Sequence, residues 1–421
     1  MRHMLTRTIG IFIILIIGSL LGGLLFVSRT PSAGTTTTVP PTQSGEDIGS
    51  PTTQPEMPPT DQTQTDLLTT SGESLKFIYS ELTAESIDIW ATEVLHPEQQ
   101  ELLLSIPRHA GFGIRAALSH DQTKIAYTTQ PPNVGDNRYL AELWVLDINT
   151  QQTQKLAEQV HIGRYMHYPL WSPDDRWIAF DRQTSVDFPY EQDIAVVNVQ
   201  TGEDITLVST SSTNTDEGSD NYMTLVDWDP SENSLYYKQM NEGQAELWRI
   251  NVPQNHSGEY INTITDDGAR CYFISPKGQF LLCSTIQSSN EIIIVVSTDK
   301  KETPIILDNL PYEFSTPIWN TDGTSIIYGF PAQGDQEAGT QFIQTDVGVT
   351  ASIHTFQFDK SEKFAPRSWS PDEQWLAGYL ISEEGRTLAI VDPDGQLMTK
   401  LADREGREFI GWLTKDMNEH K

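Results

Sequence analysis

Short runs of apolar residues recur along the chain and are separated by polar, turn-forming residues. Four of these runs contain three residues, of which the last is aromatic, and they lie at 125–127, 178–180, 235–237 and 326–328. The first three are followed within about twenty residues by a segment that opens with an acid and then continues with apolar residues, as at 142–145 and 193–196. Runs of this length between turn signals are typical of strands. The pattern therefore predicts an all-β domain.

One phrase returns before these runs. It reads Trp171-Ser-Pro-Asp, and it comes back as Trp369-Ser-Pro-Asp and as Trp319-Asn-Thr-Asp. Proline fixes φ, and Asp suits the later positions of a tight turn, so the phrase predicts a strand that ends at the Trp and then turns. A repeat of roughly 45–55 residues with four short strands in each unit is typical of a β-propeller blade.

The two ends of the domain each predict part of one four-stranded unit. Residues 75–105 predict three strands without the first strand of a unit, and residues 407–414 predict a single first strand. Pairing the two would close the ring and protect its edges. With six complete units between them, we expect seven blades. The alternative is six blades with 75–105 as an irregular cap.

The repeated phrase, the apolar-apolar-aromatic run and the acid that follows together resemble the TolB-type propeller repeat, over about 75–415. The same repeat builds the propellers of the prolyl-oligopeptidase and dipeptidyl-peptidase families. TolB carries an α/β domain before its propeller and the peptidases carry a hydrolase domain, whereas here we expect a propeller at 73–416 and a tail at 417–421. The resemblance therefore implies the fold, and neither Tol function nor peptidase activity.

The N-terminal region has a different composition. Residues 9–27 form an uncharged apolar run of 19 residues, roughly 28 Å long as a helix, which matches a bilayer core. Arg2 and Arg7 predict a cytoplasmic N-terminus at 1–8 and a propeller outside the cytoplasm, periplasmic or at the cell surface. A cleaved signal peptide is the alternative. Residues 28–72, rich in Thr, Pro and Ser, predict a disordered linker.

The formal net charge is −31, which argues against nucleic acid as a partner because phosphate binding needs a surplus of Lys and Arg. Zinc-protease, P-loop and nucleophile-elbow motifs are absent from the sequence. We expect no catalytic residue, cofactor or metal, and the oligomeric state stays open. The leading hypothesis is an interaction scaffold that binds an envelope protein or peptide. The alternative is a solute- or sugar-binding or enzymatic propeller with a polar site at the channel mouth.

Long connections at 129–141, 182–192, 210–222 and 330–341 are expected on one face of the propeller, where binding commonly occurs. Tyr and Arg are enriched at protein interfaces. The candidate binding residues on this face are Arg108, Tyr139, Arg164, Tyr165, Phe188, Tyr190, Arg270 and Tyr312.

The two cysteines and the repeated tryptophans also have predicted positions. Cys271 and Cys283 are equidistant from Lys277, so antiparallel pairing around that turn would place them opposite each other. A disulfide and two buried thiols both remain open. The tryptophans at the ends of the first strands are expected in the core rather than in a sugar-binding row. They are Trp171, Trp228, Trp319, Trp369 and Trp412.

Overall fold

The computed structural model describes most of the second of two compact units, 68–421. The described residues are 75–109, 113–132, 140–161, 168–183, 192–209, 223–241, 243–253, 258–265, 269–287, 290–299, 303–310, 315–330, 339–346, 349–356, 363–383, 385–393, 398–401 and 406–414. Among them there is no helix with the length and hydrophobicity that crossing a bilayer requires. The expected anchor, linker and tail lie outside these ranges.

The described elements are all strands, and they follow one another in groups of four. The first three strands are β1 (Lys76–Leu82), β2 (Ser86–Glu93) and β3 (Gln100–Pro107). The next two groups are β4 (Ala116–Leu118), β5 (Lys124–Thr129), β6 (Ala141–Asp147), β7 (Gln152–Val160), β8 (Leu170–Trp171), β9 (Trp177–Gln183), β10 (Gln192–Asn198) and β11 (Asp204–Ser209). Then come β12 (Met223–Trp228), β13 (Ser234–Asn241), β14 (Gln244–Asn251), β15 (Glu259–Thr265), β16 (Arg270–Ile274), β17 (Phe280–Gln287), β18 (Asn290–Ser297) and β19 (Ile305–Leu310). The last nine are β20 (Ile318–Trp319), β21 (Ser325–Phe330), β22 (Gly339–Asp346), β23 (Val349–Phe356), β24 (Lys363–Trp369), β25 (Leu376–Ser382), β26 (Gly385–Val391), β27 (Met398–Lys400) and β28 (Arg407–Leu413).

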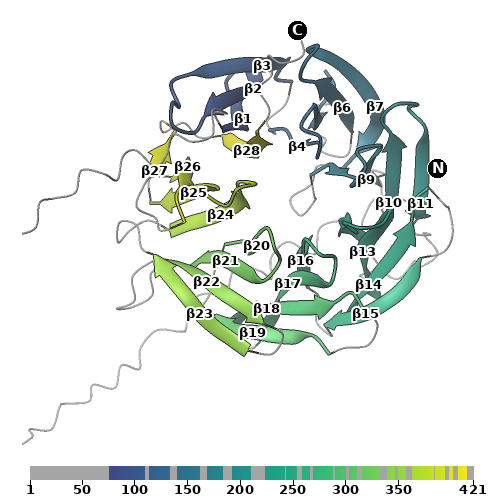
Figure 1. The fold of residues 1–421 in the computed structure, drawn as a ribbon. Helices are drawn as coiled ribbons and strands as arrows, with labels where there is room; N and C mark the ends of the chain where they lie inside the picture. The colour runs from purple at the N-terminus through teal and green to yellow at the C-terminus, as the bar shows by residue number, and fades with distance from the viewer. Residues whose placement is uncertain are drawn as a thin grey trace, which may run out of the picture. The chain divides into compact units, whose positions relative to one another are not determined.

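The groups form antiparallel sheets arranged around a centre, which is a β-propeller (Figure 1). Groups β12–β15, β16–β19, β20–β23 and β24–β27 are separate four-stranded sheets. Groups β4–β7 and β8–β11 are joined into one eight-stranded sheet through a single pair, Val160 and Arg182. The first strands of the groups contact one another in the order β28, β4, β8, β12, β16, β20 and β24, and we call them the inner strands.

The two ends of the domain share one sheet, in the order β28-β1-β2-β3. β28 pairs antiparallel with β1, from Lys76 opposite Leu413 to Glu81 opposite Arg407. The predicted pairing of the C-terminal strand with the N-terminal three is therefore confirmed. Residues 76–107 form regular strands of this sheet, so the alternative of an irregular cap is wrong.

Each sheet buries both of its faces against its neighbours, which explains the short runs that are apolar at every position. In β1, Phe77 and Tyr79 pack into a cluster with Tyr379 of β25, whereas Ile78 packs on the other side with Ile125 of β5. Successive side chains of a strand point to opposite faces, so one strand contributes to two cores. All five residues are buried.

The Ser-Pro-Asp phrase recurs because its side chains hold the turn and the neighbouring sheet. The Ser172 hydroxyl donates to Asp174 Oδ1 at 2.7 Å and accepts the Trp177 N–H at 2.9 Å. The Trp171 indole N–H donates to the Ala117 carbonyl of the preceding inner strand at 3.0 Å. The expected core position of the tryptophans is confirmed for the four that are buried, while Trp369 is half-buried.

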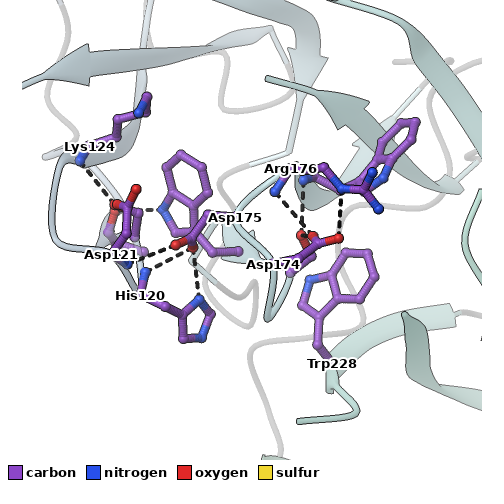
Figure 2. Close-up of polar contacts among 12 residues, drawn as sticks. His120, Asp121, Lys124, Asp174, Asp175, Arg176 and Trp228 are labelled. Atoms are coloured by element: carbon purple, nitrogen blue, oxygen red, sulfur yellow. Dashed lines mark hydrogen bonds and ion pairs between the residues drawn. The ribbon is translucent and has the colours of Figure 1, made fainter. Parts of the chain in front are cut away.

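In two of the groups, the residue after the Asp of the phrase ties its turn to the turn of the preceding group. Asp175 has a φ of 55° and accepts the backbone N–H groups of His120 and Asp121, both at 2.8 Å. Figure 2 shows Asp175 beside these two residues and hydrogen-bonded to them, and His120 Nδ1 also lies 2.9 Å from its Oδ1. A side chain that accepts two backbone donors from the preceding group of strands fixes the spacing of the two groups.

The same position makes the same connection elsewhere in the ring. Glu373, with a φ of 56°, accepts the Thr321 N–H at 3.0 Å from the preceding turn. At Gly323, with a φ of 72°, a Cβ would lie 3.2 Å from the ring of Pro276. Glycine is the residue that fits there, because the backbone is left-handed and the preceding turn is in close contact. The turns are therefore linked around one end of the propeller.

Candidate binding site at the centre of the propeller

Only two of the eight expected binding residues are described, Arg108 and Arg270. Arg108 follows β3, is half-buried and donates from Nη1 to the Thr83 carbonyl at 2.8 Å. Arg270 opens β16 and is exposed. Three groups of strands, β4–β7, β8–β11 and β12–β15, separate them along the ring. The other six lie outside the described residues: Tyr139, Arg164, Tyr165, Phe188, Tyr190 and Tyr312.

The described residues instead bring two arginines and a tyrosine together inside the ring. Arg115 stands directly before β4, Tyr168 lies two residues before β8, and Arg367 belongs to β24. The guanidinium carbon of Arg367 lies 4.6 Å from the centre of the Tyr168 ring, and that of Arg115 lies 5.6 Å from it. Two inner strands, β28 and β4, separate β24 from β8, so the contact of Arg367 with Tyr168 crosses the inside of the ring.

Local backbone features place these side chains. The pairing of β24 with β25 shifts by one residue between Pro366 and Ser368, so Arg367 is the bulged residue. A bulge bends its strand and redirects the side chain. The carbonyl of Arg115 accepts the Thr128 N–H of β5 at 2.9 Å, which extends the β4–β5 ladder by one residue. Arg115, Tyr168 and Arg367 are each half-buried, so they keep contact with solvent.

A hydrogen-bonded group of β25, β26 and β28 residues lies close to Arg367. The Tyr379 hydroxyl donates to Glu408 Oε2 at 2.9 Å and accepts the Phe409 N–H at 3.0 Å. Arg386 Nη2 donates to Glu408 Oε1 at 2.5 Å, and its guanidinium carbon lies 3.9 Å from the centre of the Tyr379 ring. Both oxygens of Glu408 are thus engaged.

Electrostatics keep Arg367 charged. Burial disfavours the charge of Arg367, but the neighbouring Tyr168, Tyr379 and Glu408 more than offset burial, so the pKa of Arg367 is raised above its ordinary value. Burial also raises the pKa of Tyr379, so its hydroxyl is protonated and donates to Glu408. Within the described part of the chain, neither Arg115 nor Arg367 forms an ion pair with a carboxylate. No described carboxylate is therefore paired with these two positive charges.

Two carboxyl groups have strongly raised pKa values, and both hold sheets together. Burial raises the pKa of Asp181 in β9 to about 7, and its Oδ1 accepts the Leu225 N–H of β12 at 3.2 Å. Burial raises the pKa of Asp227 in β12 to about 6, and its Oδ2 accepts the Ile274 N–H of β16 at 3.1 Å. Shifted pKa values often mark functional sites. Here the acceptor role explains why these side chains are buried.

The two cysteines are joined to each other, and the described residues form no metal-binding group. Cys271 of β16 and Cys283 of β17 are direct partners in the register, and a disulfide joins them in a buried cluster. In the ranges that the structure describes, no group of three or more His, Cys, Asp or Glu side chains could hold a metal ion.

The sequence contained a signal for part of the central cluster. Arg115 and Tyr168 occupy the same place in the repeat, four residues before Ser119 and Ser172. Large polar side chains at equivalent positions of two first strands indicate that both face the centre. Arg367 stands three residues before its serine, and the bulge that compensates for this offset is visible only in the structure.

Comparison with known proteins supports the fold. No protein-family model matches the chain, and no curated protein matches it either. An oligogalacturonate lyase in complex with manganese is 12% identical with a TM-score of 0.53, covering 75% of this chain and 85% of its own. The β-propeller domain of the Trilobed protease from Pyrococcus furiosus is 12% identical with a TM-score of 0.51, covering 80% and 97%.

A functionally unknown protein from Desulfotomaculum acetoxidans is similar to the same extent. It is 13% identical with a TM-score of 0.50, and the match covers 79% of this chain and 99% of that one. At such identities the resemblance extends to the fold alone. Together with the ring of four-stranded groups, it makes the domain a β-propeller, the fold implied by the resemblance of its Ser-Pro-Asp phrase to the TolB-type repeat.

Proposed function

We propose that this chain is an interaction scaffold that binds a protein or peptide with the face of the propeller opposite the Ser-Pro-Asp turns. Each group of four strands is one blade, which gives seven blades. The apolar run at 9–27 anchors the chain in a membrane, and the segment 28–72 holds the propeller away from it on the extracytoplasmic side. The partner is an envelope protein or peptide.

The rigid frame is the observation that carries this proposal. β28 closes the ring on β1, and side chains such as Asp175 and Glu373 link successive turns at one end of the blades. In an antiparallel blade, the connections from the second to the third strand and from the fourth strand to the next blade leave from the other end. Long connections on a rigid scaffold are where binding residues concentrate.

The similar structures agree with this class of function without specifying it. One of them is a propeller domain of a protease, and an acylaminoacyl peptidase in complex with Z-Gly-Gly-Phe-chloromethyl ketone, 12% identical with a TM-score of 0.50, contains a comparable propeller. This chain spans 51% of that peptidase. A propeller that accompanies peptide chemistry in other proteins makes a peptide or protein partner a reasonable first choice to test.

The test is cross-linking of the tagged full-length protein in its own membranes, followed by purification and identification of captured proteins. A triple variant changes Tyr139, Tyr190 and Tyr312 to Ala. A matched control changes three exposed side chains of the turn end to Ala, and these are Arg176, Lys277 and Gln374. We expect one envelope protein to be captured by the wild type and the control, and to be lost with the tyrosine variant. Equal capture by both variants would rule out this face.

A further inference from the structure

Arg115 and Arg367 come together at the ring of Tyr168, inside the propeller. Both guanidinium carbons lie within 6 Å of the Tyr168 ring centre, so they are at most about 10 Å apart. They come from inner strands that are not neighbours in the ring. A single small group at the centre is therefore within reach of both side chains.

Charge at this place is unbalanced. Glu408 is the carboxylate that raises the pKa of Arg367, but its two oxygens already accept hydrogen bonds from Arg386 and Tyr379. Among the described residues no other carboxylate pairs with Arg115 or Arg367. Within the described part of the chain, the charges of Arg115 and Arg367 are therefore not paired with a carboxylate.

The overall charge of −31 does not cancel this local field. At physiological ionic strength, charges separated by more than about 8 Å are largely screened, so the nearest groups determine what binds. The arginines are half-buried, which weakens the screening between them and a bound ion. An anion at the centre would gain both interactions at once.

The geometry of the donors favours an anion with paired oxygen atoms. A guanidinium presents a planar fork of N–H donors that matches two oxygens of a carboxylate or of a phosphate. Arg367 lies close to the Tyr168 ring, a contact that holds its side chain in place in the absence of a ligand. We propose that Arg115 and Arg367 bind a carboxylate of a ligand that enters the centre of the propeller. An acidic peptide segment and a small polycarboxylate both offer this chemistry.

Isothermal titration of the purified full-length chain at physiological salt tests this site. The probes are a hexa-aspartate peptide with blocked ends, its hexa-asparagine counterpart, citrate and inorganic phosphate. We expect saturable binding of the aspartate peptide or of citrate, with much weaker binding of the asparagine peptide and of phosphate. The stronger of the two carboxylate probes identifies the source of the ligand.

Variants then locate the binding. Arg115→Gln and Arg367→Gln should each lower the affinity for the carboxylate probe by about tenfold or more, because each removes charge-assisted hydrogen bonds. Arg249→Gln makes the same change of charge on β14, where Arg249 pairs with Glu259 at 3.3 Å, and should bind like the wild type. Arg367→Lys keeps the charge and removes the fork, and it should also weaken binding.

Three results would overturn the proposal. The first is that the wild type shows no saturable binding of either carboxylate probe. The second is that the wild type binds phosphate as tightly as the carboxylate probes. The third is that the Arg115→Gln variant binds the carboxylate probe as tightly as the wild type does. Circular dichroism and the thermal midpoint of each variant establish that it is folded. If Arg367→Gln does not fold, the half-exposed Arg115→Gln and the conservative Arg367→Lys still decide the question.

Discussion

Replacing Asp181 with Asn tests how neighbouring sheets of the propeller are held together. The Asp181 side chain is 6% exposed, and its Oδ1 accepts the Leu225 N–H of the next sheet at 3.2 Å. Burial raises its pKa from 3.8 to about 7. Asn keeps the carbonyl acceptor for Leu225 and carries no charge at any pH, so the variant isolates the effect of ionisation.

The sign and size of the effect follow from this shift. Between pH 4 and 7 the folded protein holds a proton on Asp181 that the unfolded chain has released, so this group makes stability fall as pH rises. Its contribution is complete below the unfolded value of 3.8 and is lost as pH rises through about 7. A pKa shift of about three units, at 1.36 kcal/mol per unit, corresponds to about 4 kcal/mol of folding free energy. Relative to the wild type, the free energy of unfolding of Asp181→Asn should therefore increase by up to about that amount between pH 4 and pH 8.

Urea unfolding at pH 4.5, 6, 7 and 8 measures the difference. Asp299→Asn is the matched control, because it makes the same change of charge at an exposed side chain. We expect the urea midpoint of Asp181→Asn to rise relative to that of the wild type as pH increases. The urea midpoint of Asp299→Asn should follow that of the wild type. If both variants respond to pH in the same way, burial of Asp181 does not govern its ionisation and the reasoning is refuted.

Two further predictions concern the turns and the cysteines. Glu373→Ala removes the acceptor of the Thr321 N–H and should destabilise the propeller by about 1–2 kcal/mol in urea unfolding, whereas the exposed neighbour Gln374→Ala should change it by less than about 0.5 kcal/mol. If the two variants changed the free energy of unfolding equally, Glu373 would not act as a link between the turns. For Cys271 and Cys283, the intact mass of the unreduced protein should lie about two mass units below that of the reduced protein, as a disulfide requires. Identical masses would show two thiols.

The repeat and its hydrogen bonds explain why so much of the fold could be predicted from sequence. Strands buried on both faces require apolar residues at consecutive positions, as in Phe77, Ile78 and Tyr79 of β1. The Ser-Pro-Asp phrase marks the turns because Ser172 and Asp174 bond within a few residues of each other. Information of this kind is local in the chain, and the missing strand at one end with the spare strand at the other indicated closure.

The six expected binding residues outside the described ranges stay predictions, whereas the central site depended on contacts that no local pattern encodes. Arg115, Tyr168 and Arg367 lie far apart in sequence and on inner strands that are not all neighbours. A bulge in β24 sets the direction of Arg367, and the closure of the ring sets its distance from Tyr168. The sequence alone determined the strands, the turns and the ring they build, because hydrophobic spacing and turn chemistry act over a few residues. The tertiary structure decided which side chains meet at the centre, because that depends on the number, tilt and closure of whole sheets.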